Sequence, residues 1–172
     1  MNDISDFNSI NDYLYILNGS LLAELVVLII VFYTPYFNSF YLKKWYTKYR
    51  LSAILADVLI LMVGIIIGRY IFTKLKIKWN IYLFVLTIVL IQIIHDIIFY
   101  LLFSNLSDGV NVMLDLFKQY AKEVQHGAII GDSFMIIIAT IMSSYFKYYS
   151  NNANIIILII QLYLLPYILH TK

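Results

Sequence analysis

The sequence contains no cysteine, only two prolines and six glycines among 172 residues, and few charges. The absence of cysteine excludes a disulfide framework, a thiolate metal site and a cysteine nucleophile. Charged residues make up 13% of the chain, about half the share of a typical soluble domain, whereas hydrophobic residues make up 62%. Polar side chains are therefore too few to cover a water-soluble globule, which excludes a soluble enzyme and a disordered tail. The net charge of +2 is too small to indicate nucleic-acid binding.

Five apolar runs are long enough to cross a membrane, for which a helix needs about 20 mainly apolar residues. The predicted spans cover residues 14–33, 51–72, 81–103, 128–146 and 155–170. Asn18-Gly19-Ser20 interrupts the first run, and Pro166 lies near the end of the last. The sequence therefore predicts an all-α, polytopic transmembrane bundle that forms a single membrane domain over residues 1–172. Because the connections are short, neighbouring spans should be antiparallel.

The connections after the first and third spans carry their own patterns. In segment 104–127, apolar residues recur at helical spacing, which predicts an amphipathic helix over about 109–125 on the membrane surface or facing a partner. These residues are Val110, Met113, Leu114, Phe117, Ala121 and Val124. Loop 36–50 and its flank are rich in aromatic residues, which predicts an interfacial belt. The belt comprises Tyr33, Tyr36, Phe37, Phe40, Tyr41, Trp45, Tyr46 and Tyr49.

Basic residues are distributed unequally between the two sides of such a bundle. The side with loop 36–50, segment 104–127 and the C-terminus carries Lys43, Lys44, Lys48, Arg50, Lys118, Lys122 and Lys172. The other side carries Arg69, Lys74, Lys76, Lys78 and Lys147. The positive-inside rule then favours an N-terminus outside and a C-terminus in the cytosol.

Five ionisable residues within the predicted spans stand out, namely Glu24, Asp57, His95, Asp96 and Asp132. A charge inside a span costs about 2.5–3.5 kcal/mol on insertion scales, so such residues usually face the bundle and mark function. At a rise of about 1.5 Å per residue, the four acids lie roughly 6–14 Å below one membrane surface. We therefore expect them in one half of the bilayer. The pattern Gly64-x-x-x-Gly68 on the face of Asp57 predicts close helix packing there.

Acids that share a low-dielectric site can serve three purposes. A pair can activate water for hydrolysis, the set can relay protons or bind a cation, and protonated acids can hydrogen-bond between helices. The first purpose predicts Asp96 and Asp132 as a catalytic pair, and the second uses all five ionisable residues. A metal site is not predicted, because the five ionisable residues include no His-x-x-x-His or Glu-x-x-His pair.

Three stretches stand out in about the last half of the chain, namely residues 91–100 (IQIIHDIIFY), 115–123 (DLFKQYAKE) and 130–133 (IGDS). In these stretches the chain resembles uncharacterised multi-spanning membrane proteins of large nucleocytoplasmic DNA viruses. The resemblance implies a virus-encoded protein of a virion's internal membrane or of a host membrane.

A second resemblance concerns the order of three motifs, His95-Asp96, Ile129-Ile130-Gly131-Asp132 and Leu164-Leu165-Pro166-Tyr167, in three successive spans. This order is similar to that of presenilin-type intramembrane aspartyl proteases. They place Tyr-Asp in one span, Gly-x-Gly-Asp in the next and Pro-Ala-Leu in a later one. The resemblance implies Asp96 and Asp132 as the catalytic pair. His95 replaces the tyrosine, Ile129 replaces the first glycine, and five spans are fewer than that family has.

The sequence as a whole predicts a non-enzymatic viral membrane protein with a structural or scaffolding role, embedded in a lipid bilayer. Capsid or membrane protein partners would bind through residues 104–127, and a homo-oligomer is left open. No cofactor and no nucleic-acid partner are predicted. The alternative is an ion or proton pathway, or an intramembrane hydrolase, that uses the acidic cluster.

Overall fold

A computed structural model describes residues 1–36 and 38–171, which form seven helices and no strand. Five helices have the length and apolar composition of membrane spans. They are α1 (Asp12–Tyr33), α3 (Leu51–Leu75), α4 (Ile81–Ser104), α6 (Gly127–Phe146) and α7 (Asn151–Leu169). The predicted all-α bundle of five spans is confirmed, and the chain is an integral, multi-pass membrane protein.

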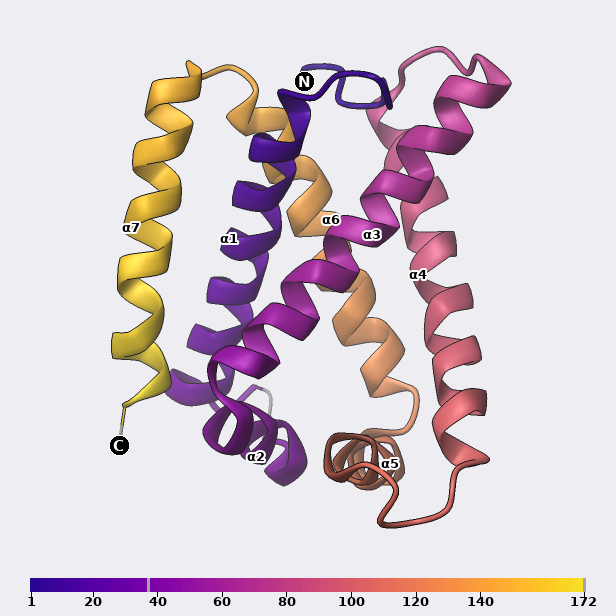
Figure 1. The fold of residues 1–172 in the computed structure, drawn as a ribbon, viewed down its shortest axis with the longest axis vertical. Helices are drawn as coiled ribbons and strands as arrows, with labels where there is room; N and C mark the ends of the chain where they lie inside the picture. The colour runs from indigo at the N-terminus through magenta and orange to yellow at the C-terminus, as the bar shows by residue number, and fades with distance from the viewer. Residues whose placement is uncertain (37, 172) are drawn as a thin grey trace.

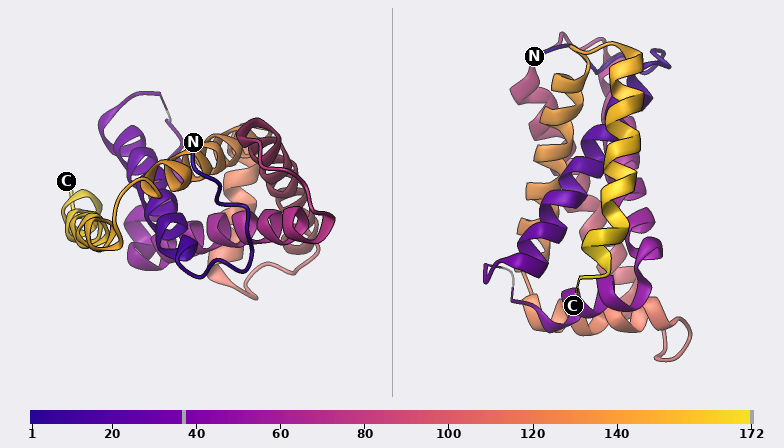
Figure 2. Two further views of the ribbon diagram at one scale, coloured as in Figure 1. Left: turned by 90° about the horizontal axis from the view of Figure 1, so that it is seen from above. Right: turned by 90° about the vertical axis from the view of Figure 1, so that its left-hand side faces the viewer.

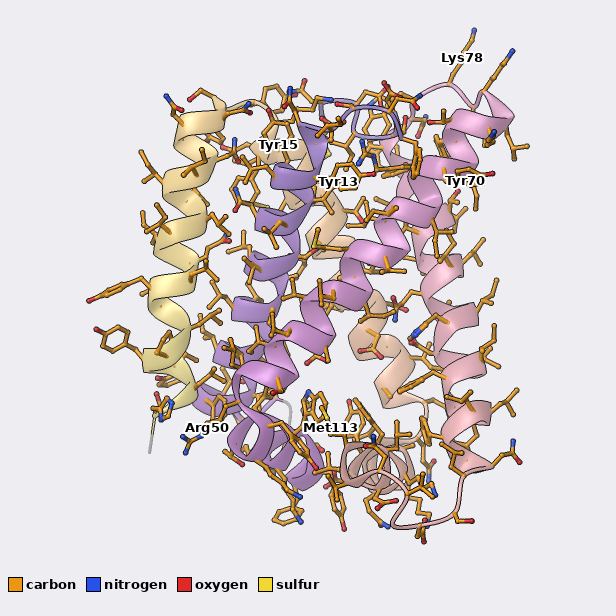
Figure 3. All side chains as sticks on the ribbon, viewed as in Figure 1. Tyr13, Tyr15, Arg50, Tyr70, Lys78 and Met113 are labelled. Atoms are coloured by element: carbon orange, nitrogen blue, oxygen red, sulfur yellow. The ribbon has the colours of Figure 1, made fainter. Side chains whose placement is uncertain are left out.

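The five long helices run between two ends of the bundle (Figure 1). The end that carries the N-terminus is called the N-side, and Lys78 and Tyr70 lie near it (Figure 3). The opposite end, called the C-side, carries the last residues of the chain, with Arg50 and Met113 nearby. Two shorter helices, α2 (Phe40–Tyr49) and α5 (Val112–Val124), lie across the C-side. The predicted amphipathic helix is thus present as α5.

Helix α1 packs against α6, α7 and α3, and twelve of its residues are buried. Seen from the N-side, α7 lies at one edge of the bundle and α4 toward the other (Figure 2). The outer faces of these two edge helices expose large apolar side chains, as expected of surfaces that contact lipid. They include Ile94, Ile97, Ile98 and Leu101 of α4 and Ile155, Ile156, Ile159 and Ile160 of α7.

Polar residues at the starts of helices explain several boundaries. The side chain of Asn80 accepts hydrogen bonds from the amides of residues 82 and 83 at the start of α4. Asn111 caps α5 in the same way, and Ser150 accepts from the amide of Ala153 at the start of α7. These N-caps satisfy amides that have no partner within the helix. They explain why α5 begins three residues later, and α7 four residues earlier, than the predicted 109 and 155.

Two expectations from the sequence are wrong. Asn18-Gly19-Ser20 does not interrupt α1, because all three residues are buried against neighbouring helices. The side-chain Nδ2 of Asn18 donates to the backbone oxygen and to Oδ1 of Asn154 in α7, both at 3.0 Å. Loop 36–50 contains helix α2, whereas its many aromatic residues had indicated only an interfacial loop. Phe37 of that belt lies outside the described residues, as does Lys172 of the C-side basic residues.

Candidate functional site

A cavity of about 360 Å³ lies at the C-side, between the ends of α3, α4 and α6 and the two surface helices. Its wall is mainly apolar and aromatic. The polar and ionisable side chains in the wall are Tyr36, Trp45, Tyr46, Asp57, Gln92, His95, Asp96, Tyr120 and Asp132. Four of the five ionisable residues singled out in the sequence, all except Glu24, therefore line one cavity.

Asp57 lies on α3 and is held by α2. The indole Nε1 of Trp45 donates a hydrogen bond of 3.0 Å to Asp57 Oδ2. Trp45 is itself buried, and its ring lies 4.6 Å from the ring of Phe117 of α5, measured between centroids. Both surface helices thus shape the part of the cavity around this carboxylate.

Asp96 and His95 are adjacent on α4, and both face the cavity. Asp96 Oδ1 accepts a hydrogen bond of 2.8 Å from Gln92 Nε2 and lies 3.2 Å from His95 Nδ1. Its other oxygen, Oδ2, is buried and has no hydrogen-bond partner among the described residues. His95 is also stacked on Phe99, with ring centroids 5.7 Å apart. One carboxylate oxygen in the cavity wall is therefore left without a donor.

Asp132 and Tyr120 face the same cavity from α6 and α5. Burial raises the pKa of the Tyr120 hydroxyl, and the negative charges of Asp132 and Asp57 raise it further. A phenol whose pKa is raised stays protonated and can donate a hydrogen bond to a neighbouring carboxylate.

Glu24 of α1 does not line the cavity but lies behind Tyr46, which does. Burial raises the pKa of the Tyr46 hydroxyl, and the carboxylates of Glu24 and Asp57 contribute to the increase. Glu24 is fully buried, and neither of its oxygens has a hydrogen-bond partner among the described residues. The acidic set thus extends from the cavity wall into the bundle.

The two predicted packing glycines lie on the face of α3 toward α4 and α6. A Cβ added at Gly68 would lie 2.8 Å from Ile88 Cγ1, so α3 and α4 approach closely there. A Cβ added at Gly64 would meet Ile136 and Gln92 only at ordinary contact distances of 3.6 and 3.8 Å. The tightest approach is instead at Gly19, where α1 meets Ala139 and Ser143 of α6.

The position of α2 over the cavity depends on a carboxylate from α5. Glu123 accepts hydrogen bonds from Ser39 Oγ at 2.5 Å and from the amides of Phe40 and Tyr41 at 2.8 and 3.1 Å. A negative charge at a helix N-terminus is stabilised by free amides and by the helix dipole. Partial burial raises the pKa of Glu123, but these hydrogen bonds outweigh it and hold the pKa below its usual value.

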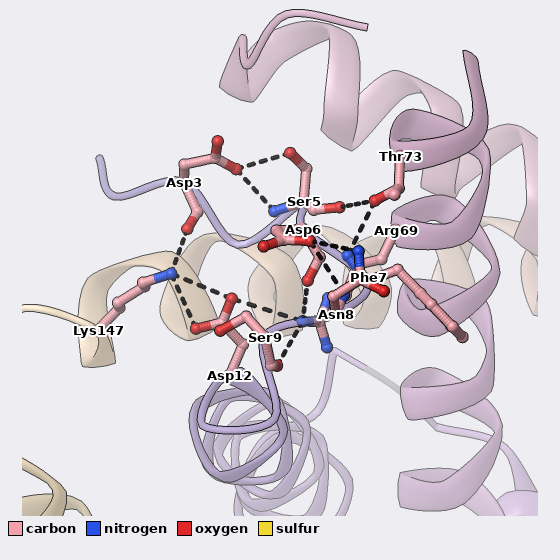
Figure 4. Close-up of polar contacts among 10 residues, drawn as sticks. All are labelled: Asp3, Ser5, Asp6, Phe7, Asn8, Ser9, Asp12, Arg69, Thr73 and Lys147. Atoms are coloured by element: carbon pink, nitrogen blue, oxygen red, sulfur yellow. Dashed lines mark hydrogen bonds and ion pairs between the residues drawn. The ribbon is translucent and has the colours of Figure 1, made fainter. Parts of the chain in front are cut away.

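A second polar site, on the N-side, was not predicted from the sequence (Figure 4). Asp12 is buried between two cations, with Lys147 Nζ at 2.8 Å and Arg69 Nη2 at 3.5 Å. Arg69 also donates to the carbonyl oxygens of Asp6 and, at 2.8 Å, of Ser9. These contacts hold residues 1–11 across the N-side of the bundle.

Arg69 is one of the five basic residues that the sequence assigns to the N-side, but it is fully buried near the end of α3. Its position inside an apolar run could have indicated the buried ion pair, since a charge within a span generally has a partner. The partner, Asp12, lies 57 residues away and belongs to a segment that the sequence placed outside the membrane.

No group of three or more His, Asp or Glu side chains among residues 1–36 and 38–171 is placed to hold a metal ion. Comparison with protein-family models, with curated proteins and with solved structures finds no match to this chain. Functional inference therefore depends on the geometry of the cavity.

Proposed function

We propose that this multi-pass membrane protein binds a cation in the acidic cavity, as the C-side part of an ion or proton pathway. One observation carries the proposal: Asp57, Asp96 and Asp132 face a single cavity inside the bundle. Each ionised group within a span costs about 2.5–3.5 kcal/mol, a cost that a cation bound in the same cavity would offset.

The unpartnered oxygens support a cation more than a structural use of the acids. Hydrogen bonds between helices would require donors for these oxygens, but Asp96 Oδ2 and both oxygens of Glu24 have none among the described residues. A buried acceptor without a donor costs about 1–3 kcal/mol. A proton or a cation supplies the missing positive charge or donor.

The cavity is placed for access from the C-side. Its lining residues come from α2, α5 and the C-side halves of the spans. The N-side is covered by residues 1–11 and their contacts with Arg69 and Lys147. In this conformation the pathway is closed on the N-side, and conduction through the whole membrane would require that segment to move.

Flux measurements in proteoliposomes test the proposal. A potassium diffusion potential drives cations inward, and dyes inside the vesicles report protons or sodium. We expect wild-type flux above that of protein-free vesicles, and its loss in Asp132→Asn. Asp108→Asn removes the same charge from an exposed C-side position outside the cavity and should conduct normally. Equal flux in wild type, Asp132→Asn and protein-free vesicles would refute the proposal.

The hydrolase alternative has less support. Two aspartates that share a proton lie about 3 Å apart. Asp96 and Asp132 are both described, and no hydrogen bond joins them; Asp96 Oδ1 is paired with Gln92 and His95 instead.

The viral origin and the scaffolding role remain predictions from the sequence. The apolar side of α5 packs inside the chain, since Leu116 is buried and Phe117 contacts Trp45. A capsid or membrane partner would therefore meet the polar side of α5 and residues 105–111. Truncation of this segment should release such a partner in detergent pull-downs.

We also propose that the C-side faces the cytosol. Arg69 and Lys147 are paired with Asp12 on the N-side, so fewer free cations remain there than the sequence count suggested. Because the chain has no cysteine, single cysteines at Lys44 and Lys78 can be labelled with a membrane-impermeant maleimide in intact cells. We expect labelling at Lys78→Cys only. Labelling at Lys44→Cys only would show that the C-side faces outward.

A further inference from the structure

The lining of the acidic cavity also indicates which kind of cation it takes, an inference that rests on the proposed function. We infer that the cavity binds an organic ammonium ion with an apolar body, with the cationic head near Asp96 and Asp132. The observations behind this are the size of the cavity, the rings in its wall and the exposed apolar residues at its rim.

The volume of the cavity suits an organic molecule. About 360 Å³ lies within the range of about 300–1,000 Å³ that small-molecule sites occupy. A bare metal ion needs six or more oxygen ligands or a tight set of nitrogen and oxygen ligands around it. The described residues provide no such set. Most of the wall is apolar, which suits the body of an organic cation better than the water shell of a metal ion.

Three aromatic rings form a connected part of the cavity wall. The Phe117 ring lies 4.6 Å from Trp45 and 5.6 Å from Phe99, measured between centroids, and all three residues line the cavity. Aromatic faces attract ammonium groups, most strongly where water is excluded. Rings together with carboxylates are the chemistry that recognises an alkylated ammonium ion.

The charge of the ligand follows from the carboxylates. Asp57 already accepts from Trp45, but Asp96 Oδ2 lies in the wall without a partner. Glu24 is completely buried close to Tyr46 and adds a further acid near the cavity. A neutral ligand would leave these acceptors unpaired, whereas a cation compensates them.

The rim offers an entry from the membrane interface. Tyr36, Ile130 and Phe134 line the cavity and are 87%, 70% and 46% exposed, respectively. The first two lie near the C-side end of the bundle, at the level of the surface helices. An amphipathic cation collects at the membrane interface with its apolar part toward the hydrocarbon. It would therefore reach this rim directly.

The two tryptophans of the chain make binding measurable. Trp45 lines the cavity, whereas Trp79 lies in the connection between α3 and α4 on the N-side. In Trp79→Phe, the emission comes from Trp45 alone. The purified protein in a nonionic detergent would be titrated with benzyltrimethylammonium and with neopentylbenzene, which has the same shape and no charge.

We expect benzyltrimethylammonium to change Trp45 emission saturably, and neopentylbenzene to bind at least about tenfold more weakly. Asp132→Asn in the same background should weaken ammonium binding about tenfold, whereas Asp108→Asn should not. The comparison of the two ligands uses a single protein and does not depend on the folding of any cavity variant.

Three results would overturn the inference. Equal binding of the neutral ligand would show an apolar cavity without charge selection. A response of Trp45 to sodium or to a pH step, but not to the ammonium ion, would exclude the organic cation while the proposed function survived. No response to any of these cations would overturn both.

Discussion

The contact between α1 and α6 at Gly19 allows a quantitative test of how the bundle packs. A Cβ added at Gly19 would lie 2.5 Å from the carbonyl oxygen of Ala139 and 2.8 Å from the amide nitrogen of Ser143. Both are backbone atoms that cannot rotate away. Since ordinary contacts begin near 3.4 Å, Gly19→Ala should push α1 and α6 apart by about 0.9 Å at this crossing.

The expected energy follows from overpacking and helix propensity. Overpacking of a tight interior costs about 1–3 kcal/mol. Alanine in a helix is favoured over glycine by about 1 kcal/mol, which offsets part of that cost. Gly64→Ala gains the same propensity without a clash, because its nearest neighbours would lie 3.6 and 3.8 Å away. The two variants should therefore differ by about 1–3 kcal/mol in the free energy of unfolding.

Reversible unfolding in mixed detergent–SDS micelles, followed by far-UV circular dichroism, measures this difference. We expect Gly64→Ala to equal or exceed the wild type and Gly19→Ala to lie below it. Gly68→Ala should fall between them, because the clash there is with the side chain of Ile88, which can move. If Gly19→Ala were as stable as Gly64→Ala, α1 and α6 could not approach each other as closely at Gly19 as described.

Two further predictions concern the polar contacts at the two ends of the bundle. Asp12→Asn leaves buried Arg69 without its carboxylate and should cost about 3–5 kcal/mol; hydrogen exchange should then become faster in residues 1–11. The folded-state pKa of Glu123 is depressed, so its contribution to stability is present above its unfolded pKa and lost as the pH falls through the folded value. The melting temperature should therefore decrease in acid, and Glu123→Gln should reduce that decrease.

Each of these predictions has a specific control. For Asp12→Asn, exchange in α5 on the opposite side serves as the internal reference, and unchanged exchange in residues 1–11 would contradict the role of the ion pair. For Glu123→Gln, Asp108→Asn removes an exposed salt bridge with Lys118 at the same membrane surface. An identical acid dependence in wild type and Glu123→Gln would show that the cap on α2 does not stabilise the fold.

The sequence by itself determined that the protein is a helical membrane protein and at what depth in the membrane its acidic residues lie. Hydropathy is a sum over neighbouring residues, so five apolar runs predicted five helices without any knowledge of their packing. Helix rise converts sequence position into depth, which is why Asp57, Asp96 and Asp132 could be expected at one level. Their common cavity depends additionally on how each helix is rotated and tilted.

Only the tertiary structure decided which residues meet. Arg69 became a buried ion-pair partner of Asp12, and Asn18 became a donor to α7, through contacts between residues far apart in the sequence. Helix α2 was not predicted because it has no long apolar run. Only one of its sides is apolar, and that side packs against the bundle and α5. Such contacts depend on the rotation and tilt of packed helices, which no local pattern in the sequence specifies.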